Sequence, residues 1–420
     1  MAVRRHAVSV LLAALLALAS TLAPAHAADA KFRAWVEALW PEAEAMGVSR
    51  ATFDLAFKGV EPDRSLPDLA PPKGGEGKGQ AEFIKSPGAY IDERRIRQLA
   101  AEGRAHLAGW GRDLDRIAKH YGVPGPIILG IWGRETDYGA ERMTHNAIRV
   151  IATQAYLGRR KDYFRNELLW ALKMLEDGEV KPAEMQSSWG GAMGLTQMMP
   201  TNFRDFAQDF DGDGRRNIWT SIPDSLASTA RSLKGAKHID GSDASWIAAQ
   251  PWGYEVRKPE KLDCTLEGVG NRRPIRDWVA LGFTRAYDRK FKDSQLDEEA
   301  FLLMPQGVYG PAFLATRNFL ALKSYNYADL YALFVGHLAD RIAGGKPFET
   351  RWADLKPMRE KSVTEMQERL AALGLYADKT DGKAGMITRV SIGKFEKQAG
   401  IDQDCFPTED DLEALRAINP

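Results

Sequence analysis

Hydrophobic positions recur with helical spacing along most of the chain. Apolar residues three and four positions apart predict helices over residues 31–69, 92–175 and 310–343. Between them, residues 251–287 contain short alternating runs such as Tyr254-Glu255-Val256 and Gly282-Phe283-Thr284, which predict a small β insertion. The pattern therefore predicts a mainly α fold with a small β insertion.

Glycine- and proline-rich stretches divide the chain. The stretch Pro71–Gly79 predicts a surface loop, and residues 345–357 predict a linker ahead of a compact module at residues 358–420. A chain of 420 residues is long enough for two or three domains. We expect one large domain over residues 28–344 and a smaller one over residues 358–420.

The N-terminal segment is typical of an export signal. Arg4 and Arg5 precede an apolar run over residues 7–22, and Ala25-His26-Ala27 is a small-x-small cleavage site. We expect residues 1–27 to be removed and the protein to be exported to the periplasm, without a membrane anchor. The alternative is a retained N-terminal anchor.

The overall charge excludes some classes of partner. The chain carries 57 basic and 57 acidic side chains, so no net charge attracts it to nucleic acid or to an anionic membrane. Its 11 Trp, 12 Tyr and 17 Phe residues indicate a folded protein. Aromatic faces also suit the stacking of sugar rings, although most aromatic side chains belong to cores.

Glu135 is the strongest candidate for chemistry. A helix is expected to begin near Pro124 and Pro126, and its apolar face includes Ile128, Ile131 and Glu135. A carboxyl group on such a face loses water, which favours the protonated form that a general acid needs. The alternative is a glutamate paired with an arginine inside the fold.

Two further segments carry polar residues among glycines or aromatics. Residues 187–200 are rich in glycine and contain Gln197, whose amide can bind ligand hydroxyl groups, and Pro200 is expected to begin a helix. Tyr325 and Asn326 form a polar pair that we expect at a helix start, about two turns before Tyr331. The alternatives are a structural turn for the first segment and a helix cap with core residues for the second.

Acidic residues at alternate positions indicate a calcium loop. Asp209, Asp211 and Asp213 are followed by Gly214, which resembles the start of an EF-hand loop. Thr220 stands where that motif has a bidentate glutamate, and Asp224 and the Arg215 carbonyl are candidates to complete the site. The alternative is a metal-free loop in which the aspartates cap turns.

The two cysteines, Cys264 and Cys405, fall in different predicted domains. A disulfide is chemically allowed in an oxidising compartment. Given their separation in sequence, we expect no bridge between them.

Together these segments resemble the membrane-bound lytic murein transglycosylase B family. The motifs that carry the resemblance are Trp-Gly-x-Glu-Thr-x-Tyr-Gly at 132–139, Gly-Ala-Met-Gly-x-x-Gln-x-Met-Pro at 191–200, the aspartate loop, Pro-Trp-Gly-Tyr-Glu-Val at 251–256 and Tyr-Asn at 325–326. The resemblance covers residues 31–344. The chain departs from the family at Ala230-Arg231-Ser232, where an aromatic residue is common, and lacks the lipid-bearing cysteine.

The resemblance implies a lysozyme-like α+β catalytic domain that acts on peptidoglycan glycan strands. Glu135 would be the lone catalytic acid and base, and no cofactor would be needed for the chemistry. The reaction would cleave the bond between N-acetylmuramic acid and N-acetylglucosamine and leave a 1,6-anhydro ring. The residues that the resemblance implies in substrate binding are Ser188, Gln197, Met198, Tyr325, Asn326, Tyr331, Arg159 and Arg160.

The C-terminal module resembles the three-helix peptidoglycan-binding domain. The matching segments include Met366–Leu370, Leu373–Tyr376 and Asp381–Gly385. The resemblance implies a tether for the substrate, and the alternative is a helical cap that stabilises the catalytic domain. For the whole chain, the alternatives to a transglycosylase are a lysozyme-like hydrolase and a non-catalytic wall-binding scaffold on the same fold.

Overall fold

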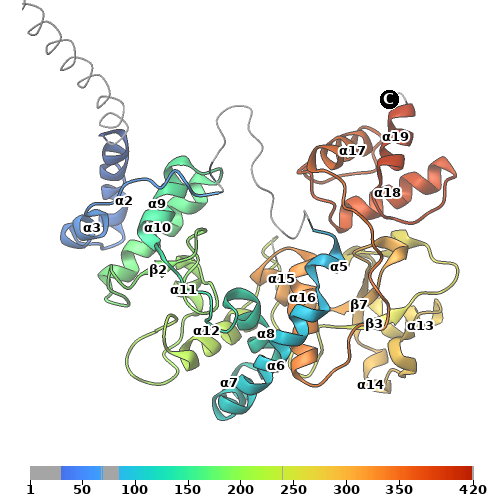
Figure 1. Cartoon of the computed structure of the whole chain (residues 1–420), viewed down its shortest axis with the longest axis horizontal. Coiled ribbons are helices and arrows are strands. Elements are labelled where there is room, and N and C mark those ends of the chain that lie inside the picture. The colour runs from blue at the N-terminus through green and yellow to red at the C-terminus, as the bar shows by residue number, and fades with distance from the viewer. Residues whose placement is uncertain (1–29, 68, 70–84, 239, 419–420) are drawn as a thin grey trace, which may run out of the picture. The chain divides into compact units, whose positions relative to one another are not determined.

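The structure is a computed structural model that describes residues 30–67, 69, 85–238 and 240–418 (Figure 1). The predicted export segment 1–27 and the loop Pro71–Gly79 lie outside the described residues. The described chain forms two compact units. The first combines residues 30–67 and 69 with Met143–Asp205 and Arg215–Trp219. The second combines residues 85–142 with Phe206–Gly214 and the described residues from Thr220 to 418.

The first unit is helical with one short β pair. β1 and β2 pair antiparallel, with His145 opposite Ser187. The prediction of helix over residues 31–69 is wrong beyond Phe57, since residues 58–67 are not helical. The part before it is three helices, because Pro41 starts a new helix and Ser49 caps the next one through its side chain. The elements are a helix at residues 30–37, α2 (Trp40–Ala45), α3 (Arg50–Phe57), β1 (His145–Asn146), α9 (Ala147–Leu157), α10 (Lys161–Glu176), β2 (Gln186–Ser187) and α11 (Pro200–Phe206).

The second unit contains a group of helices in which α8 packs against α6, α7, α12 and α16. The close approach of α8 and α16 depends on Gly130, because a Cβ atom there would lie 2.9 Å from the Val335 carbonyl oxygen. The helices are α5 (Pro87–Tyr90), α6 (Glu93–Gly109), α7 (Gly111–Tyr121), α8 (Gly125–Thr136), α12 (Ile222–Lys234), α15 (Arg317–Tyr325) and α16 (Asp329–Ile342).

The predicted β insertion is a five-stranded antiparallel sheet in the order β4-β6-β7-β3-β5. Short helices connect its strands: η1 (Cys264–Leu266), η2 (Val269–Asn271), α13 (Ile275–Ala280), η3 (Ala286–Asp288), α14 (Asp293–Leu296) and η4 (Gly307–Tyr309). The strands are β3 (Gly253–Arg257), β4 (Arg273–Pro274), β5 (Thr284–Arg285), β6 (Glu299–Leu303) and β7 (Ala312–Thr316).

The prediction of continuous helix from residue 310 is wrong at its start, where β7 lies. All five residues of β7 are buried, so the strand reads as an unbroken apolar run without alternation. Helix begins only at Arg317, where the Thr316 hydroxyl accepts a hydrogen bond from the Asn318 amide.

Residues 358–420 are here called the C-terminal module, and their described part, residues 358–418, forms three helices within the second unit (Figure 1). They are α17 (Glu360–Ala372), α18 (Met386–Ala399) and α19 (Glu409–Ala417). A small core joins them, formed by Met366, Leu370, Tyr376, Ile392, Phe395, Leu412 and Leu415.

Residues 345–357, which are predicted to be a linker, contain no helix, but they make specific contacts with the rest of the second unit. The Phe348 ring stacks on His337 with ring centroids 3.7 Å apart, and the backbone amides of Glu349 and Thr350 donate hydrogen bonds to the Glu255 carboxylate.

The expectation that the cysteines are unpaired is wrong. Cys264 and Cys405 form a disulfide, and both are buried in the core beside the sheet. Gly393 on α18 makes room for the bond, because a Cβ atom at that position would lie 2.1 Å from the Cys405 sulfur. The separation of two cysteines in sequence does not limit a pair that the fold brings together. No helix in the described ranges is long and apolar enough to cross a membrane.

Candidate active site

Glu135 lies in the last turn of α8, as the sequence predicts. The helix begins after Pro124, with Pro126 in its first turn, and it ends where Asp137 adopts a left-handed conformation with φ of 54°. Ile128 and Ile131 on the same helix are fully buried, and Glu135 is half-buried. The carboxyl group therefore sits at the edge of an apolar core, where it keeps partial contact with solvent.

Tyr331 on α16 holds the carboxyl group of Glu135. Its hydroxyl donates a hydrogen bond to Glu135 Oε1. Burial, together with the nearby charge of Glu135, raises the pKa of Tyr331 well above its ordinary value. The hydroxyl group therefore remains protonated, and it acts as a hydrogen-bond donor to the carboxylate.

Arg134 adds a cation beside this pair. Its guanidinium group lies over three aromatic rings, 5.2 Å from Tyr90, 5.3 Å from Phe334 and 5.9 Å from Tyr331. It also donates a 2.8 Å hydrogen bond to the Tyr90 hydroxyl. Arg134 directly precedes Glu135 in the chain, and its contacts with the aromatic rings place a positive charge beside the ring of Tyr331.

The neighbouring carboxylate of Asp137 is engaged elsewhere. Its Oδ1 atom forms a 2.7 Å ion pair with Arg95 of α6. Asp137 therefore pairs with α6, whereas the carboxyl group of Glu135 is bound by Tyr331 of α16.

Tyr325 and Asn326 lie at the end of a helix, not at its start as predicted. Tyr325 is the last residue of α15, and Asn326 caps that helix in an extended conformation. The Asn326 side chain accepts a hydrogen bond from the Ala328 amide and so shapes the short turn before α16. The polar residues mark the break between α15 and α16, but the sequence does not show whether they end the first helix or begin the second.

The glycine-rich segment belongs to the first unit. Gly194 has a φ of 72°, and a Cβ atom there would lie 2.5 Å from the Ile218 carbonyl oxygen, so only glycine fits this turn. Gln197 is half-buried and has a φ of 58°. Its side-chain nitrogen, Nε2, donates a 3.1 Å hydrogen bond to the Gly194 carbonyl oxygen. Ser188 is half-buried on the same segment, and Met198 is buried. As predicted, α11 begins at Pro200.

The predicted arginine pair is exposed at the turn before α10 of the first unit. Arg160 lies over the rings of Tyr163 and Phe164, at 5.0 and 5.1 Å. Arg159 precedes it in the chain. Both side chains are accessible to anionic groups.

The aspartate loop has a compact set of oxygen atoms. Carboxylate oxygens of Asp209, Asp211 and Asp213 lie within 4.8 Å of one another, and all three residues are exposed. Asp224 is fully buried, and its Oδ1 accepts hydrogen bonds from the Phe210 and Asp211 amides at 2.7 and 3.2 Å. The three exposed aspartates therefore present ligands of the kind that calcium prefers, while Asp224 supports the loop backbone.

Residues 31–340 match the family described as "Transglycosylase SLT domain". The chain is 29% identical over 231 residues to membrane-bound lytic murein transglycosylase B of Escherichia coli K12, an alignment that covers 55% of this chain and 60% of that protein. The chain thus spans less than two thirds of the length of this relative.

Solved structures of other proteins are also similar to this chain. SltB3 of Pseudomonas aeruginosa, solved in complex with NAG-anhNAM-pentapeptide and with NAG-NAM-pentapeptide, is 38% identical with a TM-score of 0.79, and the match covers 92% of this chain and 99% of that one. Slt35 of Escherichia coli in complex with calcium is 26% identical with a TM-score of 0.51, over 62% of this chain and 80% of that one.

Proposed function

The chain belongs to the transglycosylase SLT family, and from that premise we propose that it is a lytic transglycosylase of peptidoglycan. It cleaves the β-1,4 bond between N-acetylmuramic acid and N-acetylglucosamine without consuming water. The observation that carries the proposal is the hydrogen bond from Tyr331 to Glu135 at the edge of an apolar core. The peptidoglycan fragments bound to SltB3 support the same class of substrate.

Glu135 acts first as an acid and then as a base. Its proton passes to the glycosidic oxygen, the bond from that oxygen to the muramyl C1 breaks, and N-acetylglucosamine leaves. The carboxylate then accepts the proton of the muramyl C6 hydroxyl while O6 bonds to C1 and closes the 1,6-anhydro ring. Glu135 ends the cycle protonated, so the step balances without water.

Tyr331 supports both halves of this cycle. A hydrogen bond from a neutral donor stabilises the carboxylate that forms after the first proton transfer. It also fixes the rotation of the carboxyl group, which matters because proton transfer requires close approach to the glycosidic oxygen. The ion pair of Asp137 with Arg95 of α6 argues against its use as a second catalytic carboxylate. A single acid and base suits a transglycosylase better than a hydrolase that uses two carboxylates.

The substrate contacts follow from the resemblance. We assign sugar binding to Ser188, Gln197 and Met198 and to Tyr325 and Asn326. The exposed pair Arg159 and Arg160 meets the carboxylates of the lactyl group or of the peptide stem.

A structural calcium ion fits the aspartate loop. We propose that Asp209, Asp211 and Asp213 bind it together with the Arg215 carbonyl, and that Asp224 supports the loop that presents them. The calcium complex of Slt35 supports this assignment. The ion stabilises the loop and takes no part in proton transfer.

We propose further that residues 1–27 direct export to the periplasm and that the C-terminal module binds peptidoglycan. The module has the three helices and the small core that such a domain needs. A scaffold without catalysis would not require an acid held by a buried tyrosine, which favours the enzyme over that alternative.

Glu135→Gln tests the proposal. The amide keeps the shape of the side chain but cannot transfer the proton, so turnover should fall about 100- to 10,000-fold. Binding to purified sacculi and the melting temperature should stay near those of the wild type. Glu141→Gln, at an exposed position six residues further on, is the matched control. Near-normal turnover by Glu135→Gln would remove this residue from its assigned role.

A further inference from the structure

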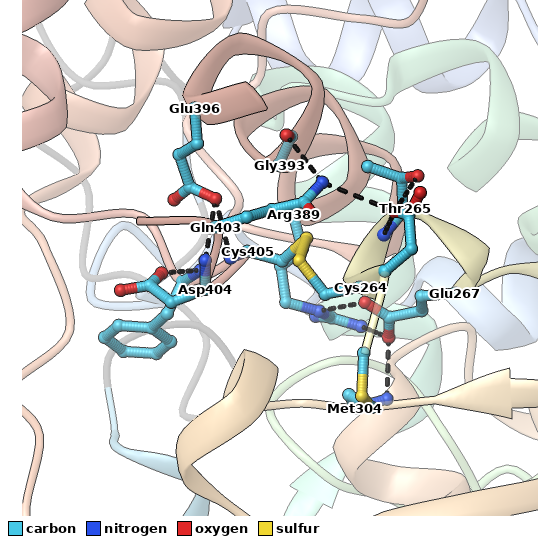
Figure 2. The surroundings of a disulfide bond; sticks show 12 residues. Cys264, Thr265, Glu267, Met304, Arg389, Gly393, Glu396, Gln403, Asp404 and Cys405 are labelled. Carbon is cyan, nitrogen blue, oxygen red and sulfur yellow. Dashed lines mark hydrogen bonds and ion pairs between the residues drawn. A yellow bond between two sulfur atoms is a disulfide. The ribbon is translucent and has the colours of Figure 1, made fainter. Parts of the chain in front are cut away.

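Arg389 connects the C-terminal module to the rest of the second unit through a buried ion pair. It lies on α18 and is 3% exposed. Its guanidinium group donates to both carboxylate oxygens of Glu267, at 3.0 Å from Nε and 2.6 Å from Nη2 (Figure 2). Such a two-point contact between planar groups fixes the orientation of both side chains.

Glu267 is itself anchored on the sheet side of this contact. It follows η1, and its Oε1 accepts a 2.8 Å hydrogen bond from the Met304 amide. The Cys264–Cys405 disulfide lies beside it and joins the same two parts of the chain covalently (Figure 2). Arg389 is therefore held in a defined position by a rigid partner.

The same guanidinium group reaches the start of α16. Its Nη2 lies 3.4 Å from Oδ2 of Asp329, and Asp329 Oδ1 accepts a 2.6 Å hydrogen bond from Lys323. Burial opposes ionisation of Asp329, but Lys323 and Arg389 outweigh it, so the pKa of Asp329 lies below its ordinary value. An ionised carboxylate at the first residue of a helix is thus fixed from two sides.

Asp329 stands two residues before Tyr331. The first turn of α16 is closed by hydrogen bonds from the Tyr331 and Ala332 amides to the Ala328 carbonyl, at 3.1 and 3.2 Å. A shift of Asp329 moves this turn, and the turn carries the hydroxyl group that holds Glu135. The chain of contacts therefore runs from the C-terminal module to the catalytic carboxyl group.

We propose that Arg389 is a positioning residue for the reaction: acting through Asp329, it fixes the first turn of α16 and thereby sets Tyr331 against Glu135. This inference rests on the proposed function of Glu135. It gives the C-terminal module a role in turnover itself, beyond any binding of the cell wall. A module that served only as a tether would raise the local concentration of glycan and leave the turnover of short soluble fragments unchanged.

The test compares Asp329→Asn, Arg389→Gln and Arg389→Lys in the full chain. Asp329→Asn weakens the contacts of Asp329 with both Arg389 and Lys323, and it leaves the pair of Arg389 with Glu267 and the disulfide in place. Arg416→Gln is the matched control, since Arg416 forms its ion pairs within the C-terminal module, with Glu365 and Glu413. Each variant is assayed on short soluble peptidoglycan fragments, well below its own melting temperature.

The expected result is a change in kcat rather than in KM. A misplaced catalytic group should lower kcat about 10- to 100-fold in Asp329→Asn and Arg389→Gln, with KM close to that of the wild type. Arg389→Lys keeps the charge and should recover part of the loss, and Arg416→Gln should behave as the wild type. Wild-type kcat in folded Asp329→Asn would overturn the proposal.

Hydrogen exchange of the amides in the first turn of α16 gives a readout that needs no substrate. The amides of Tyr331 and Ala332 should exchange faster in Asp329→Asn than in the wild type and in Arg416→Gln. Unchanged exchange would overturn the proposal even if turnover fell. If the wild type cleaved glycan by hydrolysis alone, the proposed reaction would fail while kcat and exchange would still decide the role of Arg389.

Discussion

The hydroxyl group of Tyr331 donates a hydrogen bond to the carboxyl group of Glu135, 196 positions earlier in the chain. The two residues lie on α16 and α8, which approach closely because Gly130 has no side chain. A buried neutral donor against a half-buried acid is the central feature of the proposed catalytic site.

Tyr331→Phe removes this donor while it keeps the ring. A hydrogen bond to a charged group contributes about 1.5 to 3 kcal/mol, so kcat should fall about 10- to 100-fold. The measurement is steady-state turnover of soluble glycan fragments. Tyr327→Phe is the control, because Tyr327 is exposed and lies in the turn before the same helix. Equal kcat in the two variants would show that the hydroxyl group of Tyr331 does not support catalysis.

The sequence predicts the helix that carries Glu135 well because its signals are local. Pro124 and Pro126 mark the helix start, and the apolar spacing places Glu135 on the core side. The hydrogen bond from Tyr331 to Glu135 is not predictable in this way, since it depends on the packing of two helices far apart in the chain. The sequence shows Tyr331 about two turns after Tyr325, and only the family resemblance implies a place for it at the site.

Other parts of the structure depend on tertiary contacts that leave no periodic signal. β7 is buried on both faces, so its apolar run lacks the alternation of a half-exposed strand and the sequence predicts helix there. The Cys264–Cys405 disulfide joins η1 to the segment between α18 and α19, and no local pattern in the sequence predicts that these two segments meet. Residues 345–357 have the composition of a linker, yet Gln306 exchanges two hydrogen bonds with the backbone of Ala353.

The disulfide should stabilise the second unit. A double variant, Cys264→Ser with Cys405→Ser, should lose about 2 to 5 kcal/mol of unfolding free energy, because the unfolded chain is no longer constrained by a long closed loop. Thermal or denaturant unfolding measures the loss. A reducing agent should destabilise the wild type and leave the double variant unaffected. Identical unfolding of the wild type with and without reductant would contradict this prediction.

Glu396 should make stability depend on pH. It is 1% exposed, and burial raises its pKa from about 4.5 to about 8. A raised pKa in the folded state gives stability that is full below pH 4.5 and is lost as the pH rises through 8. Glu396→Gln keeps an oxygen acceptor for the Asp404 and Cys405 amides and does not titrate. The wild type should therefore lose melting temperature relative to this variant as the pH rises across that range. Parallel pH profiles of the two proteins would argue against the assigned pKa.

Calcium should raise the melting temperature. An ion that binds only the folded state stabilises it by about 2.7 kcal/mol at a concentration 100 times its dissociation constant. Asp213→Asn removes one of the clustered carboxylates and should reduce this effect. The measurement is thermal unfolding in calcium and in chelator, for both proteins. A wild type that melts at the same temperature in both would mean that the loop is stable without metal.

Mass spectrometry of the muropeptides released from purified sacculi by the wild-type protein tests the central claim most directly. If Glu135 acts alone as acid and base, the products carry 1,6-anhydromuramic ends, and Glu135→Gln releases none of them. Products that are one water heavier, with reducing muramic ends and no anhydro form, would identify a hydrolase and contradict the account.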